Sequence, residues 1–300
     1  MAMNDVPNHL IVAARTGFLA AAEKPDKMDW PKVAELFPMT AKSQELVDLG
    51  AAPMPVENKT RPQMQGFIEK SKTITPTDWE ITVGISYNDV KDDQTGNLLR
   101  KVKSAGDNFQ RHINKRVFQV LNGGDGSTYG LCYDDNEYFD TQHADAGAHY
   151  STVQSNLGTS ALSIDNFETA LIAARKFLDD QGEYCNFGFD QLVVSPELER
   201  TAYQIVNNPN VYDTANHEVN PYAGRFKTPI VSAQMDSTAW ILTASEESVK
   251  PLIVAMREKP HLQAYGFKSE AVKGGLYWFK FYGRYEVHYA DWRLAYMGKS

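Results

Sequence analysis

The sequence predicts an α+β fold that contains one long helix and several groups of strands. Apolar residues between positions 97 and 121 recur every three or four residues, which is typical of a long amphipathic helix. Residues 79–87 instead alternate between apolar and polar, as in a strand with one buried face. Nine of the 34 aromatic residues fall between Tyr277 and Tyr296, which favours further strands in a core or a large contact surface.

Composition excludes several classes of protein. The chain of 300 residues is 42% hydrophobic and 23% charged, so it is long enough and apolar enough for one large or two modest domains. The net charge of −8 argues against a surface that is basic all over, although local basic surfaces are still expected. Cys132 and Cys185 are too few and too far apart in the sequence for a disulfide framework or a zinc ribbon. This favours a reducing compartment. No run of about 18 apolar residues is present, which excludes a membrane span.

The first 63 residues are expected to form an arm with little regular structure after one short helix. Residues 9–24 have an amphipathic pattern, and six prolines then interrupt the chain between positions 25 and 62. Such a segment buries little apolar surface against itself. We therefore expect it to be held by contacts outside the local chain.

Residues 64–92 are expected to form an extended hairpin. Residues 67–74 would be its first strand, residues 79–87 its second strand, and residues 75–78 the turn. An isolated hairpin is marginally stable in water, so another part of this chain or a neighbouring chain must cover its apolar face. Our hypothesis is that a neighbouring subunit covers most of it. The predicted interface residues are Trp79, Ile81, Val83, Ile85 and Tyr87.

The long helix over 97–121 is expected to have a strongly basic exposed side. Asn122 and Gly123 are expected to end it. Its exposed side carries six cations and only one acid, Asp107. These cations are Arg100, Lys101, Lys103, Arg111, Lys115 and Arg116. One interpretation is contact with phosphates, which would be independent of base sequence because no aromatic residues are interleaved. The other is a solvated surface whose charges pair with acidic neighbours.

A small α/β unit is expected in the middle of the chain. Ser163 would cap a helix that ends at Gly182, residues 192–194 would be a buried strand, and Ser195 with Pro196 would begin another helix. Asparagines and prolines between 207 and 229 indicate a long loop. Further strands are expected at 230–234, 240–243, 252–256 and 276–296.

The strongest candidate for catalysis is a segment with two histidines and two acids. Asp140, His143, Asp145 and His149 are acceptable zinc or manganese ligands, so a metal-assisted hydrolase is an alternative function. Their spacing matches no helical zinc motif, and a solvated loop is the simpler interpretation. The glycine-rich residues 122–130 lack the ending of a phosphate-binding loop. We therefore expect no enzymatic activity and no cofactor.

A series of short motifs resembles one protein family. In order, they are WPKVAE at 30–35, PMTAK at 38–42, EITVGIS at 80–86, DVKDD at 89–93, CYD at 132–134, YFDTQH at 138–143, NLGT at 156–159, ALSIDNFE at 161–168, LVVSP at 192–196, TAWIL at 238–242, KPLI at 250–253 and WRLAY at 292–296. Through them the chain is similar to the Mu-like prophage major head subunit family. That family comprises tailed-phage major capsid proteins of the Hong Kong 97 type. Gln142 and Ala144 stand where the family has an acidic residue and a proline.

The resemblance implies a division of the chain and a set of partners. The division is an N-terminal arm at 1–63, an extended hairpin loop at 64–92, a peripheral domain with a spine helix at 93–186, an axial domain at 187–245 and returning peripheral strands at 246–300. The subunits would form the hexamers and pentamers of an icosahedral virion shell, assembled in the host cytoplasm around double-stranded DNA. Separate scaffold, protease and portal proteins are implied, and the six helix cations would face the DNA. A tail or connector protein is a further alternative.

Overall fold

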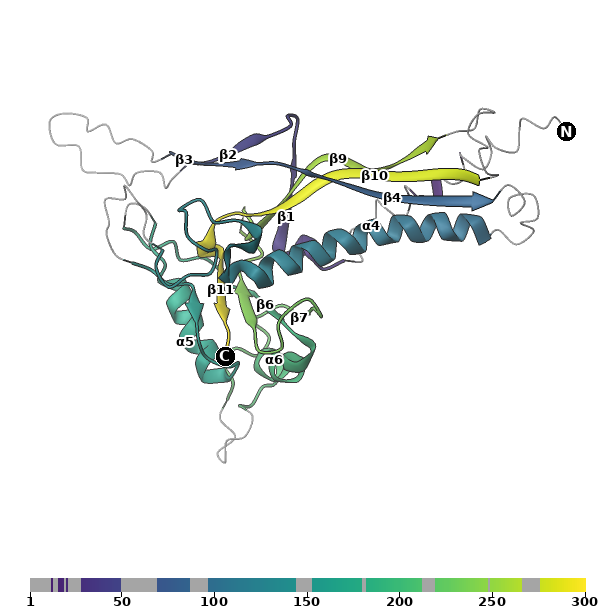
Figure 1. The fold of residues 1–300 in the computed structure, drawn as a ribbon. Coiled ribbons are helices and arrows are strands. Elements are labelled where there is room, and N and C mark those ends of the chain that lie inside the picture. The colour runs from purple at the N-terminus through teal and green to yellow at the C-terminus, as the bar shows by residue number, and fades with distance from the viewer. Residues whose placement is uncertain are drawn as a thin grey trace.

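The structure, a computed structural model, has the α+β fold that the sequence predicts. It describes residues 12, 16–18, 20, 28–49, 69–86, 97–143, 153–179, 182–211, 219–247, 249–265 and 276–300. Figure 1 shows an elongated upper part, in which a long helix lies under a sheet, and a more compact lower part that contains the C-terminus.

The long helix α4 (Asn97–Asn122) confirms the prediction from periodicity. Phe109, Ile113 and Val117 are buried, and they recur at steps of four residues. This spacing places them on one side of the helix, which therefore packs against the upper sheet along much of its length (Figure 1).

The upper sheet has the strand order β1-β9-β10-β4. Its strands are β1 (Ala34–Pro38), β9 (Leu252–Tyr265), β10 (Leu276–Tyr289) and β4 (Thr77–Ser86). β1 is parallel to β9, whereas β10 is antiparallel to both β9 and β4. β9 is much longer than the predicted strand at 252–256. It tolerates Pro260 because the register with β10 shifts there, opposite Gly283, at which an added Cβ would lie 3.3 Å from the Pro260 Cα.

The predicted hairpin at 64–92 is wrong. β3 (Glu69–Ile74) and β4 follow each other in the chain but do not pair. β3 pairs instead with β2 (Gln44–Leu49), and this antiparallel pair is called the β2–β3 ribbon below. In Figure 1 the chain continues from β3 into β4 in nearly the same direction. Thr75 and Pro76 therefore interrupt an extended segment and do not reverse it.

The N-terminal segment is more regular than predicted. Helix α2 (Trp30–Val33) leads into β1, and β2 follows. The Trp30 backbone N–H donates to the Asn114 side chain on α4 at 3.0 Å, and Phe18 stacks on Phe281 with ring centroids 4.6 Å apart. The described parts of this segment thus pack against α4 and β10 of the same chain. The sequences of β1 (AELFP) and β2 (QELVDL) do not alternate strictly between apolar and polar residues, so their pattern does not predict strands.

The lower sheet has the order β5-β11-β8-β6-β7. Its strands are β5 (Leu157–Gly158), β11 (Ala295–Gly298), β8 (Trp240–Thr243), β6 (Gln191–Val194) and β7 (Ile230–Val231). The strands expected at 192–194 and 240–243 are confirmed. The lower sheet extends beyond residues 187–245, because β5 and β11 also belong to it.

Two helices flank the lower sheet: α5 (Ile164–Arg175) and α6 (Glu199–Asn207). The Ser163 side chain accepts a hydrogen bond from the Asn166 N–H at 3.2 Å, which confirms the predicted cap. Ser195 does not cap a helix with its side chain. Its hydroxyl donates to the Ser237 carbonyl at 3.2 Å, and a short 3₁₀ turn precedes α6.

One main hydrophobic core joins the upper and lower parts. It includes Phe109 from α4, Phe281 from β10, Leu192 from β6 and Trp292 near the C-terminus. Among the helices that the structure describes, none is both long and apolar enough to cross a membrane.

Candidate functional site

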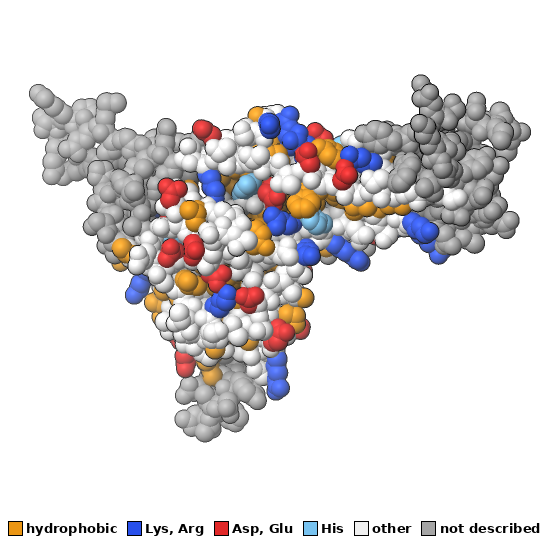
Figure 2. Space-filling model, viewed as in Figure 1, with side chains coloured by type: hydrophobic (Ala, Val, Ile, Leu, Met, Phe, Trp, Pro, Cys, Tyr) orange, Lys and Arg blue, Asp and Glu red, His pale blue; other side chains and the backbone are white. Residues whose placement is uncertain are grey.

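The exposed side of α4 carries five of the six predicted cations. They are Arg100, Lys101, Lys103, Arg111 and Lys115, and they are called the α4 basic surface below. Within the described part of the chain, none of these five side chains forms an ion pair. Figure 2 shows Lys and Arg side chains along the lower edge of the elongated part of the molecule, where α4 lies.

Arg116 does not belong to this surface, so its predicted role is wrong. Its Nη2 lies 2.8 Å from the Glu286 Oε1 on β10, and both side chains are largely buried. The guanidinium also lies 5.1 Å from the ring centroid of Tyr129 and 5.9 Å from that of Trp79. Arg116 therefore ties α4 to the upper sheet.

Two cations on the face of the upper sheet opposite α4 are paired with acids. Lys280 on β10 lies 2.5 Å from Glu80 on β4, and Arg284 lies 2.5 Å from Asp78. Phe279 and Phe281 are buried on the α4 side, so alternation places Lys280 on the other face. Lys280 and Arg284 on β10 are thus paired with acids, whereas the five cations of the α4 basic surface have no ion pair within the described residues.

The predicted interface on β4 does not need a neighbour to bury it. Trp79, Ile81 and Val83 are half-buried and pack against the chain's own main core. The Trp79 indole N–H donates to the Tyr285 carbonyl at 2.9 Å. Ile85 pairs with Tyr277 in the strand register, but its side chain and Tyr87 lie outside the described residues. The argument that assigned these residues to a subunit interface is therefore wrong.

His143 is buried and held by two neighbouring side chains. Its Nδ1 lies 2.6 Å from the Asp134 Oδ2, and its Nε2 lies 3.1 Å from the Asn156 Oδ1. The Asn156 Nδ2 donates to three backbone carbonyls, which fixes its Oδ1 towards the imidazole. Both ring nitrogens of His143 therefore face side-chain oxygen atoms, which fixes the orientation of the ring. Burial raises the pKa of Asp134, but the hydrogen bond and positive charge of His143 outweigh it, so the pKa is lowered.

The predicted metal ligands are not brought together in the described residues. The Asp140 Oδ1 accepts the backbone N–H groups of Thr141 and Gln142 at 2.5 and 3.1 Å. Asp145 and His149 lie outside the described residues. No group of three or more His, Cys, Asp or Glu with metal-binding geometry occurs in the part that the structure describes. The hydrolase alternative therefore has no support.

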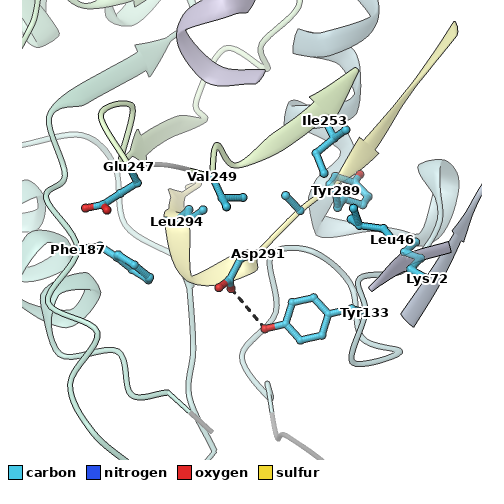
Figure 3. Close-up of a pocket in the computed structure, with 11 residues that line it drawn as sticks. Leu46, Lys72, Tyr133, Phe187, Glu247, Val249, Ile253, Tyr289, Asp291 and Leu294 are labelled. Carbon is cyan, nitrogen blue, oxygen red and sulfur yellow. Dashed lines mark hydrogen bonds between the residues drawn. The ribbon is translucent and has the colours of Figure 1, made fainter. Parts of the chain in front are cut away.

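A cavity of about 250 Å³ lies where the β2–β3 ribbon meets the two sheets (Figure 3). It is lined by Leu46, Lys72, Tyr133, Phe187, Glu247, Val249, Ile253, Tyr289, Ala290, Asp291 and Leu294. No local sequence signal predicts this cavity, because its residues come from six separated segments and form no motif.

Comparison with known proteins identifies the family. The model of a family described as phage capsid protein matches residues 69–297. A search of curated proteins finds no match. Among solved structures, the chain is similar to the procapsid of bacteriophage JBD30, with 22% identity and a TM-score of 0.57 over 97% of this chain and 75% of that chain.

Two further structures share the fold at lower identity. The capsid of an empty GTA particle is 10% identical with a TM-score of 0.58, over 89% of this chain and 88% of that chain. A virus-like particle from Pyrococcus furiosus is 12% identical with a TM-score of 0.53, over 95% of this chain and 97% of that chain. The long helix under a sheet, the projecting ribbon and the second α/β part are common to a Hong Kong 97-type capsid fold. The chain belongs to the phage capsid protein family and is a major capsid protein.

Proposed function

We propose that this major capsid protein assembles, as hexamers and pentamers, into a closed icosahedral shell around double-stranded DNA. The family match over residues 69–297 supports a structural role without catalysis. The similar JBD30 and GTA structures are themselves procapsids or capsids. In this proposal, α4 and the upper sheet form the peripheral domain, the lower part forms the axial domain, and the β2–β3 ribbon is the extended loop.

The difference in charge between the two faces of the elongated part is the observation that carries the inside-outside assignment. The five cations of the α4 basic surface have no ion-pair partners in the described residues, whereas Lys280 and Arg284 on the opposite face are neutralised. Phosphate contacts by unpaired cations release counterions and do not depend on base sequence. The α4 side therefore suits the inner wall of the shell.

The finer assignment is to the Mu-like branch of the family. Its support is the set of sequence motifs from residue 30 to residue 296. This branch implies separate scaffold, protease and portal proteins, assembly in the host cytoplasm and a final location in the virion capsid. Co-purification of these three proteins with immature shells would test the assignment.

Electron microscopy of the purified chain tests the assembly. We expect closed spherical shells, formed either by the chain alone or after addition of the scaffold protein. Rings would instead favour a connector protein and tubes a tail protein. A metal-dependent hydrolytic activity in the same sample would reopen the enzyme alternative.

A triple variant tests the DNA-facing surface. Lys103→Gln, Arg111→Gln and Lys115→Gln should leave empty-shell assembly intact and reduce the DNA retained by filled particles, with a weaker dependence on salt. The control exchanges three exposed cations elsewhere, Lys42, Arg200 and Lys259, for Gln. Loss of empty shells in the α4 variant alone would show that these side chains form ion pairs between subunits and would contradict the DNA-facing assignment.

A further inference from the structure

Lys72 is a half-buried cation that has no anionic partner among the residues that the structure describes. Its ammonium group donates to the Leu131 carbonyl and lies 5.6 Å from the centroid of the Tyr289 ring. In the described residues no carboxylate lies within 4.0 Å of it. Burial lowers the pKa of Lys72 more than the more distant Cys132, Asp134 and Asp135 raise it. A buried charge in this state is stabilised by any anion that reaches it.

Neither acid of the cavity lining, Asp291 or Glu247, forms an ion pair with Lys72. The Asp291 carboxylate accepts from the Arg293 guanidinium at 2.9 Å and from the Tyr133 hydroxyl at 3.3 Å (Figure 3). The Glu247 Oε1 accepts the Gly188 N–H at 3.1 Å. Of the charged groups in the lining, Asp291 is thus paired with a cation, Glu247 accepts from a neutral N–H group, and Lys72 on the ribbon has no carboxylate within 4.0 Å among the described residues.

The rest of the lining is suited to an apolar side chain. Leu46, Ile253 and Leu294 contribute aliphatic surface, and Val249 is 45% exposed although it is a large hydrophobic residue. A volume of about 250 Å³ is below the usual range of about 300 to 1,000 Å³ for small-molecule sites. It is close to the volume of one large side chain.

We propose that this cavity is a socket in which a neighbouring copy of the chain inserts an apolar side chain and places an adjacent carboxylate against Lys72. The inference rests on the proposed assembly into a shell. A second copy is the fitting occupant because capsid subunits meet at high local concentration, and because a chain with 38 acidic residues and a net charge of −8 supplies carboxylates in excess. The neighbour neutralises the charge that the isolated subunit leaves unpaired.

Substitution of Lys72 distinguishes a role in binding a neighbouring subunit from a role in the stability of the subunit itself. Lys72→Met keeps the aliphatic stem and removes the charge, so the unassembled subunit should unfold at an unchanged or higher temperature. The concentration needed for shell formation should rise at least about tenfold, because the incoming carboxylate loses its partner. Lys42→Met, at an exposed lysine close to the ribbon, is the matched control. Unchanged assembly, or a loss of subunit stability that parallels the loss of assembly, would overturn the proposal.

A photo-crosslinker identifies the occupant. Benzoylphenylalanine replaces Val249 in one population of subunits, which is mixed with an isotope-labelled population before assembly. We expect crosslinks between the two populations to a peptide that has Asp or Glu within two residues of the linked position. The control position is Val153, which is 55% exposed and lies outside the cavity.

Three outcomes would overturn the socket: crosslinks within one chain, crosslinks to a different protein, or none in assembled shells. Because shells are imaged in the same samples, failure of the socket is distinguishable from failure of the proposed function. If the socket is wrong, shells form without the expected crosslink. If the proposed function is wrong, the unmodified chain forms no shells.

Discussion

The imidazole of His143 lies flat against the indole of Trp292, with ring centroids 4.1 Å apart and an angle of 4° between the planes. The same imidazole faces the Asp134 carboxylate, and both side chains are buried. The contact joins the segment after α4 to the C-terminal part of the chain. The hydrogen bond to Asp134 on one side and the indole face of Trp292 on the other hold the His143 ring in one orientation.

Loss of the Asp134 charge should destabilise the isolated subunit. Asp134→Asn removes the buried carboxylate that lies 2.6 Å from the His143 Nδ1, and we expect a loss of about 3 kcal/mol of unfolding free energy. Urea unfolding of unassembled protein measures it. Asp135→Asn is the control, because Asp135 is exposed and its φ of 61° is one that Asn adopts readily. Equal stability of the two variants would contradict the buried ion pair.

Stability should also depend on pH through His288. Burial, Lys72 and Arg116 lower its pKa to about 4, although Glu286 and a backbone hydrogen bond at Thr75 oppose this. Below about pH 6.5 the His288 side chain binds a proton in the unfolded chain, whereas in the folded chain it stays neutral until the pH approaches about 4. The unfolding free energy should therefore fall as the pH is lowered from about 6.5 to about 4, by about 2 to 3 kcal/mol in total.

The His288→Gln variant checks this expectation, because it removes the titrating group. Its unfolding free energy, measured in urea at pH 7 and pH 4.5, should fall by less than that of the unmodified protein. His261→Gln, on the outer face of β9, should retain the full dependence. An identical fall in the His288 variant would mean that other groups cause it.

Arg116 and Lys115 are neighbours in sequence but should behave differently. Arg116→Gln breaks the largely buried pair with Glu286 and the contacts with two aromatic rings, so we expect a loss of about 2 kcal/mol. Lys115→Gln should change stability by less than about 0.5 kcal/mol, because its side chain is exposed. Thermal unfolding of the unassembled subunit compares them. Equal effects would place Arg116 back on the α4 basic surface.

A substitution at Ile81 tests the corrected position of β4. Ile81→Asp places a carboxylate against the chain's own core, and we expect a loss of several kcal/mol in the isolated subunit. Little folded protein should accumulate. Thr82→Asp, on the other face of the same strand, should fold normally. If Ile81→Asp gave a stable subunit that only failed to assemble, a neighbouring chain would be the partner of this face.

The parts of the fold that the sequence predicts well are those with a local signal. The repeat of apolar residues defined α4 to within one residue at its end, and Ser163 marked the start of α5. Alternation in residues 79–86 gave the correct strand. It could not give the partner of that strand, because β10 lies far away in the chain, and a nearby apolar run is the simplest choice from sequence.

The candidate sites show the same limit. His143 resembles a metal ligand by residue type, but its role depends on Asn156 and Trp292, which no spacing rule connects to it. Arg116 follows Lys115 in the basic helix, yet one further step around the helix turns it towards Glu286. Charge alone therefore predicted five members of the α4 basic surface and misplaced the sixth.

The continuity of β3 with β4 has a mechanical consequence for the ribbon. A pull on the ribbon along its length is transmitted through Thr75 and Pro76 into β4, which is ten residues long and pairs with β10 throughout. Interstrand hydrogen bonds lie across the strand direction, so such a pull strains all of them together and not one after another. The connection between β3 and β4 therefore resists a pull along the strands strongly, whereas a force across the strands would break the hydrogen bonds one at a time. A ribbon anchored in this way can carry load between neighbouring subunits when a shell is placed under internal pressure.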